Sequence, residues 1–141
     1  MRKQFSQEQY NQDDAAAKKA VCGYLFKRWK YIPLVNKDLY GIDIICYKNG
    51  KIAGYVEVER RHSWRGEFTY PTIHVPGRKR KFFENQETTN LIFSVRSDLK
   101  KAFWIDGREV LNSPVVFLDN KECDNEDFFD VPIQKWTLVA L

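Results

Sequence analysis

The chain has 141 residues and a net charge of +4, with 43% hydrophobic and 15% aromatic residues. This length fits one domain with one proper core, and the apolar content argues against a disordered chain. No apolar run approaches the length of a membrane span, and the polar N-terminus lacks the apolar core of a signal peptide.

The first elements expected along the chain are a long helix and a short strand. Ser6 and Gln9 resemble a capping box, and the apolar spacing predicts a helix over residues 7–28. Its expected buried stripe consists of Tyr10, Ala17, Ala20, Val21, Tyr24 and Leu25. Residues 31–35 are expected to form a strand, which Pro33 places at a sheet edge or a bulge.

Three acids lie among apolar residues in the next predicted unit, a β-hairpin with its turn at Asn49-Gly50. Asp43 belongs to the first strand, and Glu57 and Glu59 belong to the second. Burying an unpaired carboxylate costs on the order of several kcal/mol, so acids in such strands suggest a use. Carboxylate oxygens are the ligands that Mg²⁺ and Mn²⁺ prefer, so the three acids are candidate metal ligands.

The parity of the hairpin decides whether these acids share one face. Side chains alternate along a strand, so the acids converge only if paired residue numbers sum to an even number. An odd loop or a bulge satisfies this condition, and we predict a three-residue loop at 48–50 with Gly50 left-handed. The alternative is a half-exposed hairpin whose acids simply face solvent.

Positive charge is concentrated directly after the acidic hairpin. Residues 60–81 carry seven basic side chains and one acid, which gives +6 and leaves −2 for the remainder of the chain. The basic residues are Arg60, Arg61, Arg65, Arg78, Lys79, Arg80 and Lys81. A polyanion bound there would bring its phosphates to the acids, so a nucleic acid is the expected partner. The alternative is a solvated charged surface.

The segment after the hairpin predicts a loop, a basic helix and a strand. Residues 64–76 are expected to be a loop rich in aromatic residues. Residues 77–85 are expected to be a basic helix anchored by Phe82 and Phe83. Residues 91–95 have the short apolar run of a buried strand.

The last third of the chain predicts mainly β-structure. Residues 102–111 are expected to form a second hairpin around Asp106-Gly107, followed by a strand at 115–118. Residues 119–130 hold six acids and one lysine, and are expected to be an exposed loop. Residues 133–141 fit either a strand or a short helix.

The order of these elements and the acids of the hairpin resemble the PD-(D/E)xK nuclease superfamily. Gly41-Ile42-Asp43 looks like its GxD strand, and Val56-Glu57-Val58-Glu59 looks like its (D/E)xK strand. Residues 70–83 also resemble segments of small phage-encoded members. The resemblance extends to about Val95 and implies a restriction-endonuclease-like α/β fold of three layers. One domain over residues 1–141 would hold a central mixed β-sheet flanked by helices.

The resemblance implies an endonuclease, dependent on Mg²⁺ or Mn²⁺, that hydrolyses phosphodiester bonds in DNA. Asp43, Glu57 and Glu59 would be its catalytic and metal-binding residues, and the metal would activate water. DNA would be the partner, with RNA left open, and a homodimer is expected by analogy with small junction-resolving relatives. The expected location is the cytoplasm of a bacterium or a phage-infected host.

The sequence departs from the superfamily motif at Glu59, where a lysine is usual. Glu59 would then bind metal or act as general base. A lysine could instead come from elsewhere, from Lys79 or Lys81 of the basic helix or from Lys37. Glu8 resembles an extra acid that some members project from the first helix, although the first turn of any helix favours acids.

Two other functions remain open at this point. One is a catalytically inactive protein that keeps the nuclease fold and binds nucleic acid or an assembly partner. The other is an inhibitor whose acidic segment, residues 119–130, mimics DNA. Cys22, Cys46 and Cys123 have neither zinc-ligand spacing nor a disulfide framework, which indicates a reducing compartment and positions in the core.

Overall fold

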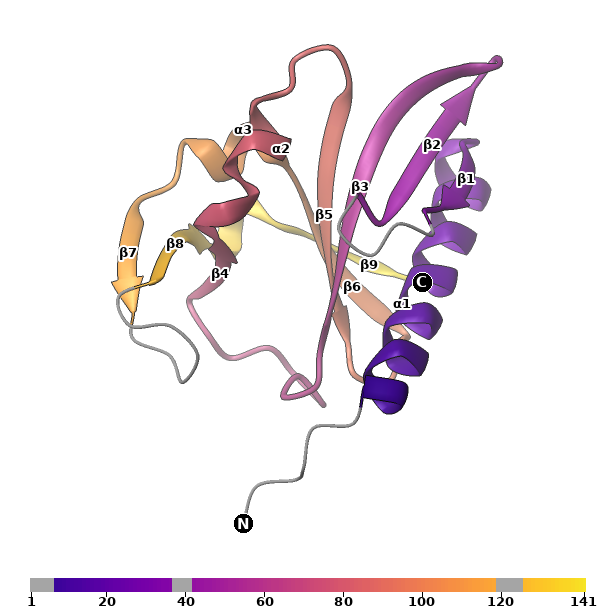
Figure 1. Ribbon diagram of the computed structural model, residues 1–141. Helices are drawn as coiled ribbons and strands as arrows, with labels where there is room; N and C mark the ends of the chain where they lie inside the picture. Colours follow the sequence, from indigo (N-terminus) through magenta and orange to yellow (C-terminus); the bar gives the residue numbers. More distant parts are fainter. Residues whose placement is uncertain (1–6, 37–41, 119–125) are drawn as a thin grey trace.

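In the computed structural model, the protein is an α/β fold with a mixed sheet of six strands and a second sheet of three strands (Figure 1). The structure describes residues 7–36, 42–118 and 126–141, and of residues 7–13 only the backbone. The elements are α1 (Gln7–Trp29), β1 (Ile32–Val35), β2 (Ile44–Lys48), β3 (Lys51–Arg61), β4 (Thr72–Pro76), η1 (Gly77–Lys79), α2 (Arg80–Glu84), β5 (Thr89–Arg96), β6 (Lys101–Asp106), α3 (Gly107–Leu111), β7 (Val115–Leu118), β8 (Glu126–Pro132), η2 (Ile133–Lys135) and β9 (Thr137–Ala140).

The large sheet has the strand order β1-β2-β3-β5-β6-β9. β1, β2 and β3 are antiparallel neighbours, β5 runs parallel to β3, and β6 and β9 continue the sheet antiparallel. The parallel pair needs a crossover, and β4, η1 and α2 lie in that connection. The small sheet has the order β4-β8-β7, with both pairs antiparallel.

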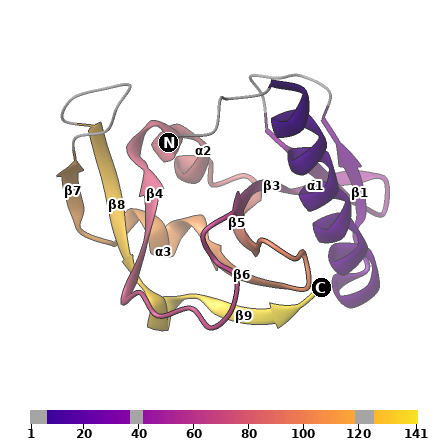
Figure 2. The same cartoon turned by 90° about the horizontal axis from the view of Figure 1, so that it is seen from below.

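Helix α1 covers one face of the large sheet (Figures 1 and 2). Ala17, Val21 and Leu25 are fully buried, and their spacing of four residues forms one helical stripe. They belong to one core with Val56 and Val58, two even-numbered residues of β3 beyond the bulge at Ala53. The odd-numbered side chains of β3 are therefore directed to the other face of the sheet.

The opposite face of the large sheet is covered by the small sheet together with η1, α2 and α3 (Figure 2). Ile92, Phe103 and Ile105 of the large sheet pack there in a second core with Ile73 and Val131 of the small sheet. The sequence led us to expect helices on both faces. The second layer is instead largely β-structure, because β4 and β8 present alternating buried residues to the large sheet.

The N-terminal elements agree with the sequence-based expectation. α1 and β1 match the predicted helix and strand, and β1, with Pro33, lies at an edge of the large sheet. In the rest of the predicted stripe, Ala20 and Tyr24 are half-buried, and Tyr10 lies outside the described side chains.

The β2–β3 hairpin reaches the predicted parity by a different route. Asn49 and Gly50 have positive φ angles of 54° and 76°, and they form a two-residue turn. The predicted three-residue loop is therefore wrong. The pairing shifts between Cys46 and Tyr47, which leaves Ala53 of β3 as an additional residue. Beyond this bulge the paired residue numbers sum to an even value, so Glu57 and Glu59 lie on the face of β3 opposite to Val56 and Val58. Asp43 precedes β2 and lies beside this strand pair.

Three expectations for the later segments are corrected. Residues 72–76, expected in a loop, form β4. Gly107–Leu111 form α3 instead of a hairpin strand, because the Asp106 carboxylate caps the helix and accepts the Arg108 N–H at 2.9 Å. The end of the expected acidic loop belongs to β8, while residues 119–125 lie outside the described part.

The other expected elements are confirmed. The basic helix corresponds to η1 and α2, with Phe83 buried and Phe82 partly buried in the second core. The strands at 91–95 and 115–118 correspond to β5 and β7. Residues 133–141 contain both η2 and β9.

Cys22 and Cys46 are free thiols in the core beneath α1, and Cys123 lies outside the described residues. Burial, with a smaller contribution from Cys22, raises the pKa of Cys46 to about 12. This thiol is therefore protonated at neutral pH and acts as a small apolar residue.

Candidate active site

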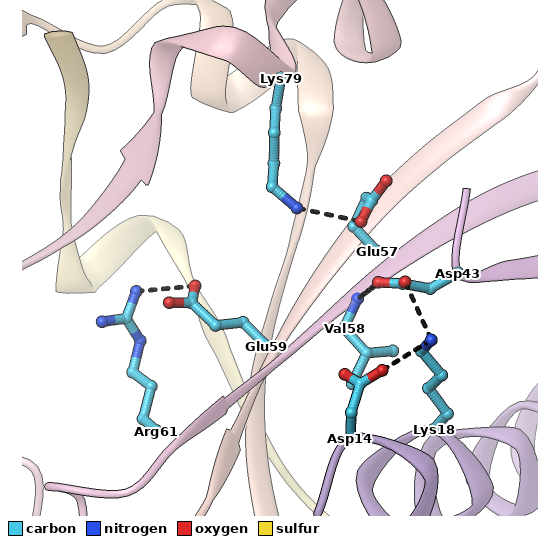
Figure 3. A network of polar contacts seen from close by, with 8 residues as sticks. All are labelled: Asp14, Lys18, Asp43, Glu57, Val58, Glu59, Arg61 and Lys79. Atoms are coloured by element: carbon cyan, nitrogen blue, oxygen red, sulfur yellow. Dashed lines mark hydrogen bonds and ion pairs between the residues drawn. The ribbon is translucent and has the colours of Figure 1, made fainter. Parts of the chain in front are cut away.

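Asp43 lies immediately before β2, at the point where this strand stops pairing with β3. The register pairs Ile44 with Val56, so its continuation places Asp43 opposite Glu57. β2 offers Val58 no backbone partner, and Asp43 Oδ2 accepts the Val58 N–H at 2.8 Å. This bond fixes the carboxylate of Asp43 against β3 (Figure 3).

Glu57 is paired with a lysine that comes from the crossover connection. Its Oε2 is 3.0 Å from the Nζ of Lys79, the last residue of η1. Both side chains are largely buried, with 14% and 20% of their surface exposed. The pKa of Glu57 is raised to about 7, because the effects of burial and of the neighbouring Asp43 together outweigh the lowering effect of Lys79.

Asp43 and Glu57 together could hold a divalent cation. The two carboxyl groups are close enough to interact by a hydrogen bond and by charge. Mg²⁺ is commonly bound through one or two carboxylates, with water completing its shell. The donor set fits such an ion, and the raised pKa of Glu57 shows that Lys79 alone does not compensate for burial of the charge.

A second lysine reaches the site from α1. Lys18 Nζ lies 3.3 Å from Asp43 Oδ1 and 2.8 Å from Asp14 Oδ2, one helical turn earlier. Burial alone lowers the pKa of Lys18, but the hydrogen bonds and charges of Asp14 and Asp43 outweigh this effect and raise it. The ammonium group is therefore firmly protonated between two carboxylates (Figure 3).

Glu59 lies apart from the other two acids of the hairpin (Figure 3). Its Oε2 is 3.2 Å from Arg61 Nη2, and 39% of its side chain is exposed. Among the described residues, no group of three or more His, Cys, Asp or Glu side chains is placed to hold a metal ion. The structure thus brings Asp43 and Glu57 together but does not add Glu59 to them.

Apart from Lys79, which pairs with Glu57, the basic residues predicted to bind nucleic acid divide into two groups. Arg60 donates to the Ser97 carbonyl, and Arg61 donates to the His74 carbonyl and to Ser94 Oγ, so both tie elements of the fold together. The basic residues with exposed side chains are Arg65, Arg78, Arg80 and Lys81. Three of these four lie on η1 and α2, the connection that also provides the lysine paired with Glu57.

The remaining predicted candidates are Lys81, Glu8 and Lys37. Lys81 is exposed on α2, whereas Lys79, two residues earlier, contacts Glu57. The backbone of Glu8 belongs to α1, but its side chain lies outside the described part, as does Lys37. The position of Lys79 relative to Glu57 depends on the crossover, which spacing along the chain does not reveal.

Sequence reasoning missed Asp14 and Lys18. Their spacing of four residues places them on one side of α1, and Lys18 directly follows the buried Ala17. That pattern is a detectable signal for a polar pair beside the buried stripe. The contact of Lys18 with Asp43, however, depends on how α1 packs against the hairpin.

Comparisons with protein-family models, with curated proteins and with solved structures find no match to this chain. In the part of the chain that the structure describes, no helix is both long enough and apolar enough to cross a membrane.

Proposed function

We propose that this protein is a nuclease that uses Mg²⁺ or Mn²⁺ to hydrolyse phosphodiester bonds in DNA. The observation that carries the proposal is the contact of 3.0 Å between Lys79 Nζ and Glu57 Oε2, beside Asp43. Two acids and one lysine are the residue types of the PD-(D/E)xK motif. We propose that Lys79 takes the role of the lysine that Glu59 replaces in the strand.

The order of the elements supports the same proposal. A helix precedes three antiparallel strands, and the next strand of the large sheet runs parallel to the third after a basic crossover. This order resembles the core of the restriction-endonuclease-like fold, which we include in the proposal. The small sheet would then be an addition to that core.

Each residue of the site would have a distinct task. Asp43 and Glu57 would hold the metal ion, which when bound lowers the pKa of its water ligand and stabilises charge on the phosphate. Lys79 would hold its proton at Nζ and donate a charged hydrogen bond beside the reacting phosphate. The exposed side chains of Arg78, Arg80 and Lys81 would contact the DNA backbone.

A homodimer and a cytoplasmic location belong to this proposal as expectations from the resemblance. RNA is the alternative substrate, since neither the acids nor the basic residues distinguish it from DNA.

A catalytically inactive relative that binds nucleic acid is the second candidate. The ion pairs of Glu57 with Lys79 and of Asp43 with Lys18 favour it, because each carboxylate already has a lysine partner without a metal ion. Such a protein would keep its nucleic-acid affinity when either acid is replaced.

The test is a cleavage assay on supercoiled plasmid, single-stranded DNA and a four-way junction, with Mn²⁺ or with EDTA. Wild-type protein is compared with Glu57→Gln and with Glu84→Gln, which replaces an exposed acid on α2. We expect cleavage with Mn²⁺ by the wild type and by Glu84→Gln, and loss of cleavage in Glu57→Gln.

Cleavage that persists in Glu57→Gln would contradict the proposal and indicate a contaminating nuclease. DNA binding by the wild type without cleavage of any of the three substrates would support the inactive relative. Cleavage of RNA, but not of DNA, would show that RNA is the substrate and would leave the proposed mechanism unchanged.

A further inference from the structure

Lys18 forms an ion pair with the carboxylate oxygen of Asp43 that does not accept the backbone hydrogen bond. Asp43 Oδ2 accepts the Val58 N–H, whereas Oδ1 lies 3.3 Å from Lys18 Nζ. The side chains of Lys18 and Asp43 are only 15% and 19% exposed. A cation approaching Asp43 therefore meets the positive charge of Lys18 at a partly buried position.

Asp14 is a second carboxylate partner of Lys18. Its Oδ2 is 2.8 Å from Lys18 Nζ, a shorter distance than that between Lys18 and Asp43. Asp14 and Lys18 are one turn apart on α1, so this ion pair forms within a single rigid element. A Lys18 side chain that moved away from Asp43 would therefore still have a carboxylate partner on its own helix.

We propose that Lys18 competes with the divalent cation for Asp43, and that Asp14 holds Lys18 when the cation binds. This inference rests on the proposed function, because it concerns the same metal site. Like charges a few Å apart repel strongly at a partly buried position, so the ammonium group lowers the affinity for metal. The protein would thus carry an internal counter-ion that protects its acids when metal is scarce and sets the metal concentration needed for binding.

Opposite effects are expected from the two residues. Lys18→Met removes the competing charge and should tighten binding of Mn²⁺ by about tenfold or more. Lys18→Gln should do the same, because it removes the charge but keeps a hydrogen-bond donor. Asp14→Asn leaves Lys18 with Asp43 as its one carboxylate partner among the described residues and should weaken binding by about threefold to tenfold.

The experiment is a titration of the full-length protein with Mn²⁺, in which electron paramagnetic resonance measures the free ion. Lys19→Met is the matched control, since it removes one positive charge from an exposed neighbouring position on α1. Binding is measured below the melting temperature of every variant, and circular dichroism confirms that each one is folded. Asp43→Asn shows which part of the binding belongs to the site.

Tighter binding in both Lys18 variants, weaker binding in Asp14→Asn and no change in Lys19→Met would support the inference. If the wild type binds Mn²⁺ through Asp43 and the Lys18 variants bind it equally well, the inference fails and the proposed function stands. If neither the wild type nor the Lys18 variants bind Mn²⁺, the metal site itself is refuted, and the inference falls with it. If a Lys18 variant does not fold, the other Lys18 variant and Asp14→Asn decide.

Discussion

Glu57 combines burial with a basic partner, Lys79, and this combination sets its chemistry. Its carboxylate is mostly removed from water, Asp43 lies beside it, and Lys79 contacts one of its oxygens. Burial disfavours the charged form more strongly than one ion pair restores it. At neutral pH, the side chain is therefore poised between a neutral acid and a carboxylate, and a cation would favour the carboxylate.

This balance predicts a dependence of stability on pH. The pKa of Glu57 is about 7 in the folded protein and 4.5 for an ordinary glutamate, so the folded state binds the proton more tightly. The stabilisation from this proton is fully present below pH 4.5 and is lost as the pH rises through 7. The loss amounts to roughly 1–3 kcal/mol. Glu57→Gln has no carboxyl proton at this position, so its stability should not show this loss.

The measurement is urea unfolding of both proteins at pH 4.5 and pH 8 in EDTA. The free energy of unfolding of the wild type, relative to that of Glu57→Gln, should be lower at pH 8 than at pH 4.5. An equal difference between the two proteins at both pH values would show that burial does not control the protonation of Glu57.

At the scale of the elements, the site depends on how β3 lies between its two neighbours. β2 pairs with β3 only as far as Ile44 and Val56, and Asp43 continues the contact with a side chain in place of the backbone. On the other side, β5 pairs in parallel from Thr89, opposite Gly54. The crossover between β3 and β5 then brings a lysine back over the acids.

Gly54 predicts where this arrangement is sensitive to an added methyl group. A Cβ at Gly54 would lie 2.7 Å from the Thr89 carbonyl oxygen, so Gly54→Ala should lower the free energy of unfolding by about 1–3 kcal/mol. Gly23→Ala is the matched control. Its Cβ meets no atom within 4 Å, and alanine favours the helix by roughly 0.5–1 kcal/mol. Urea unfolding that shows both variants shifting in the same direction would contradict the close approach of β3 and β5.

The two groups of basic residues predict different consequences of substitution. Lys81 is exposed on α2, so Lys81→Ala should leave stability unchanged and reduce the dependence of log K for DNA on log salt by about one. Arg61 pairs with Glu59 and donates hydrogen bonds to two neighbouring strands, so Arg61→Ala should instead lower stability by about 1–3 kcal/mol. Salt titrations of DNA binding and urea unfolding check both. A loss of stability in Lys81→Ala with an unchanged salt dependence would show that Lys81 supports the fold and does not contact DNA.

At the scale of the whole molecule, two cores lie on opposite faces of one sheet. The core beneath α1 follows directly from sequence periodicity, because the helix stripe and the alternating strand residues are local patterns. The second core does not, because β4 and β8 pair across a long stretch of the chain, as in Ile73 with Val131. α3 was missed for a local reason, since Asp106-Gly107 suits a hairpin turn as well as a helix start.

The candidate site likewise combines residues that local sequence patterns predict with contacts that they do not. Asp43 and Glu57 could be predicted because acids in apolar strands are costly, and the bulge at Ala53 preserves the parity that the prediction required. The contact of Lys79 with Glu57 depends on the crossover, and that of Lys18 with Asp43 depends on helix packing. Neither follows from residue spacing in one strand.

The assignment of Lys79 to the role that the motif gives to a strand lysine is tested most directly by the rate of plasmid nicking in Mn²⁺. Wild type is compared with Lys79→Met and with Glu59→Gln, measured at equal protein concentration. We predict that Lys79→Met is slower by about a hundredfold or more, and that Glu59→Gln stays near the wild-type rate. A Lys79→Met protein that nicks at the wild-type rate, or a Glu59→Gln protein that is equally impaired, would contradict this assignment.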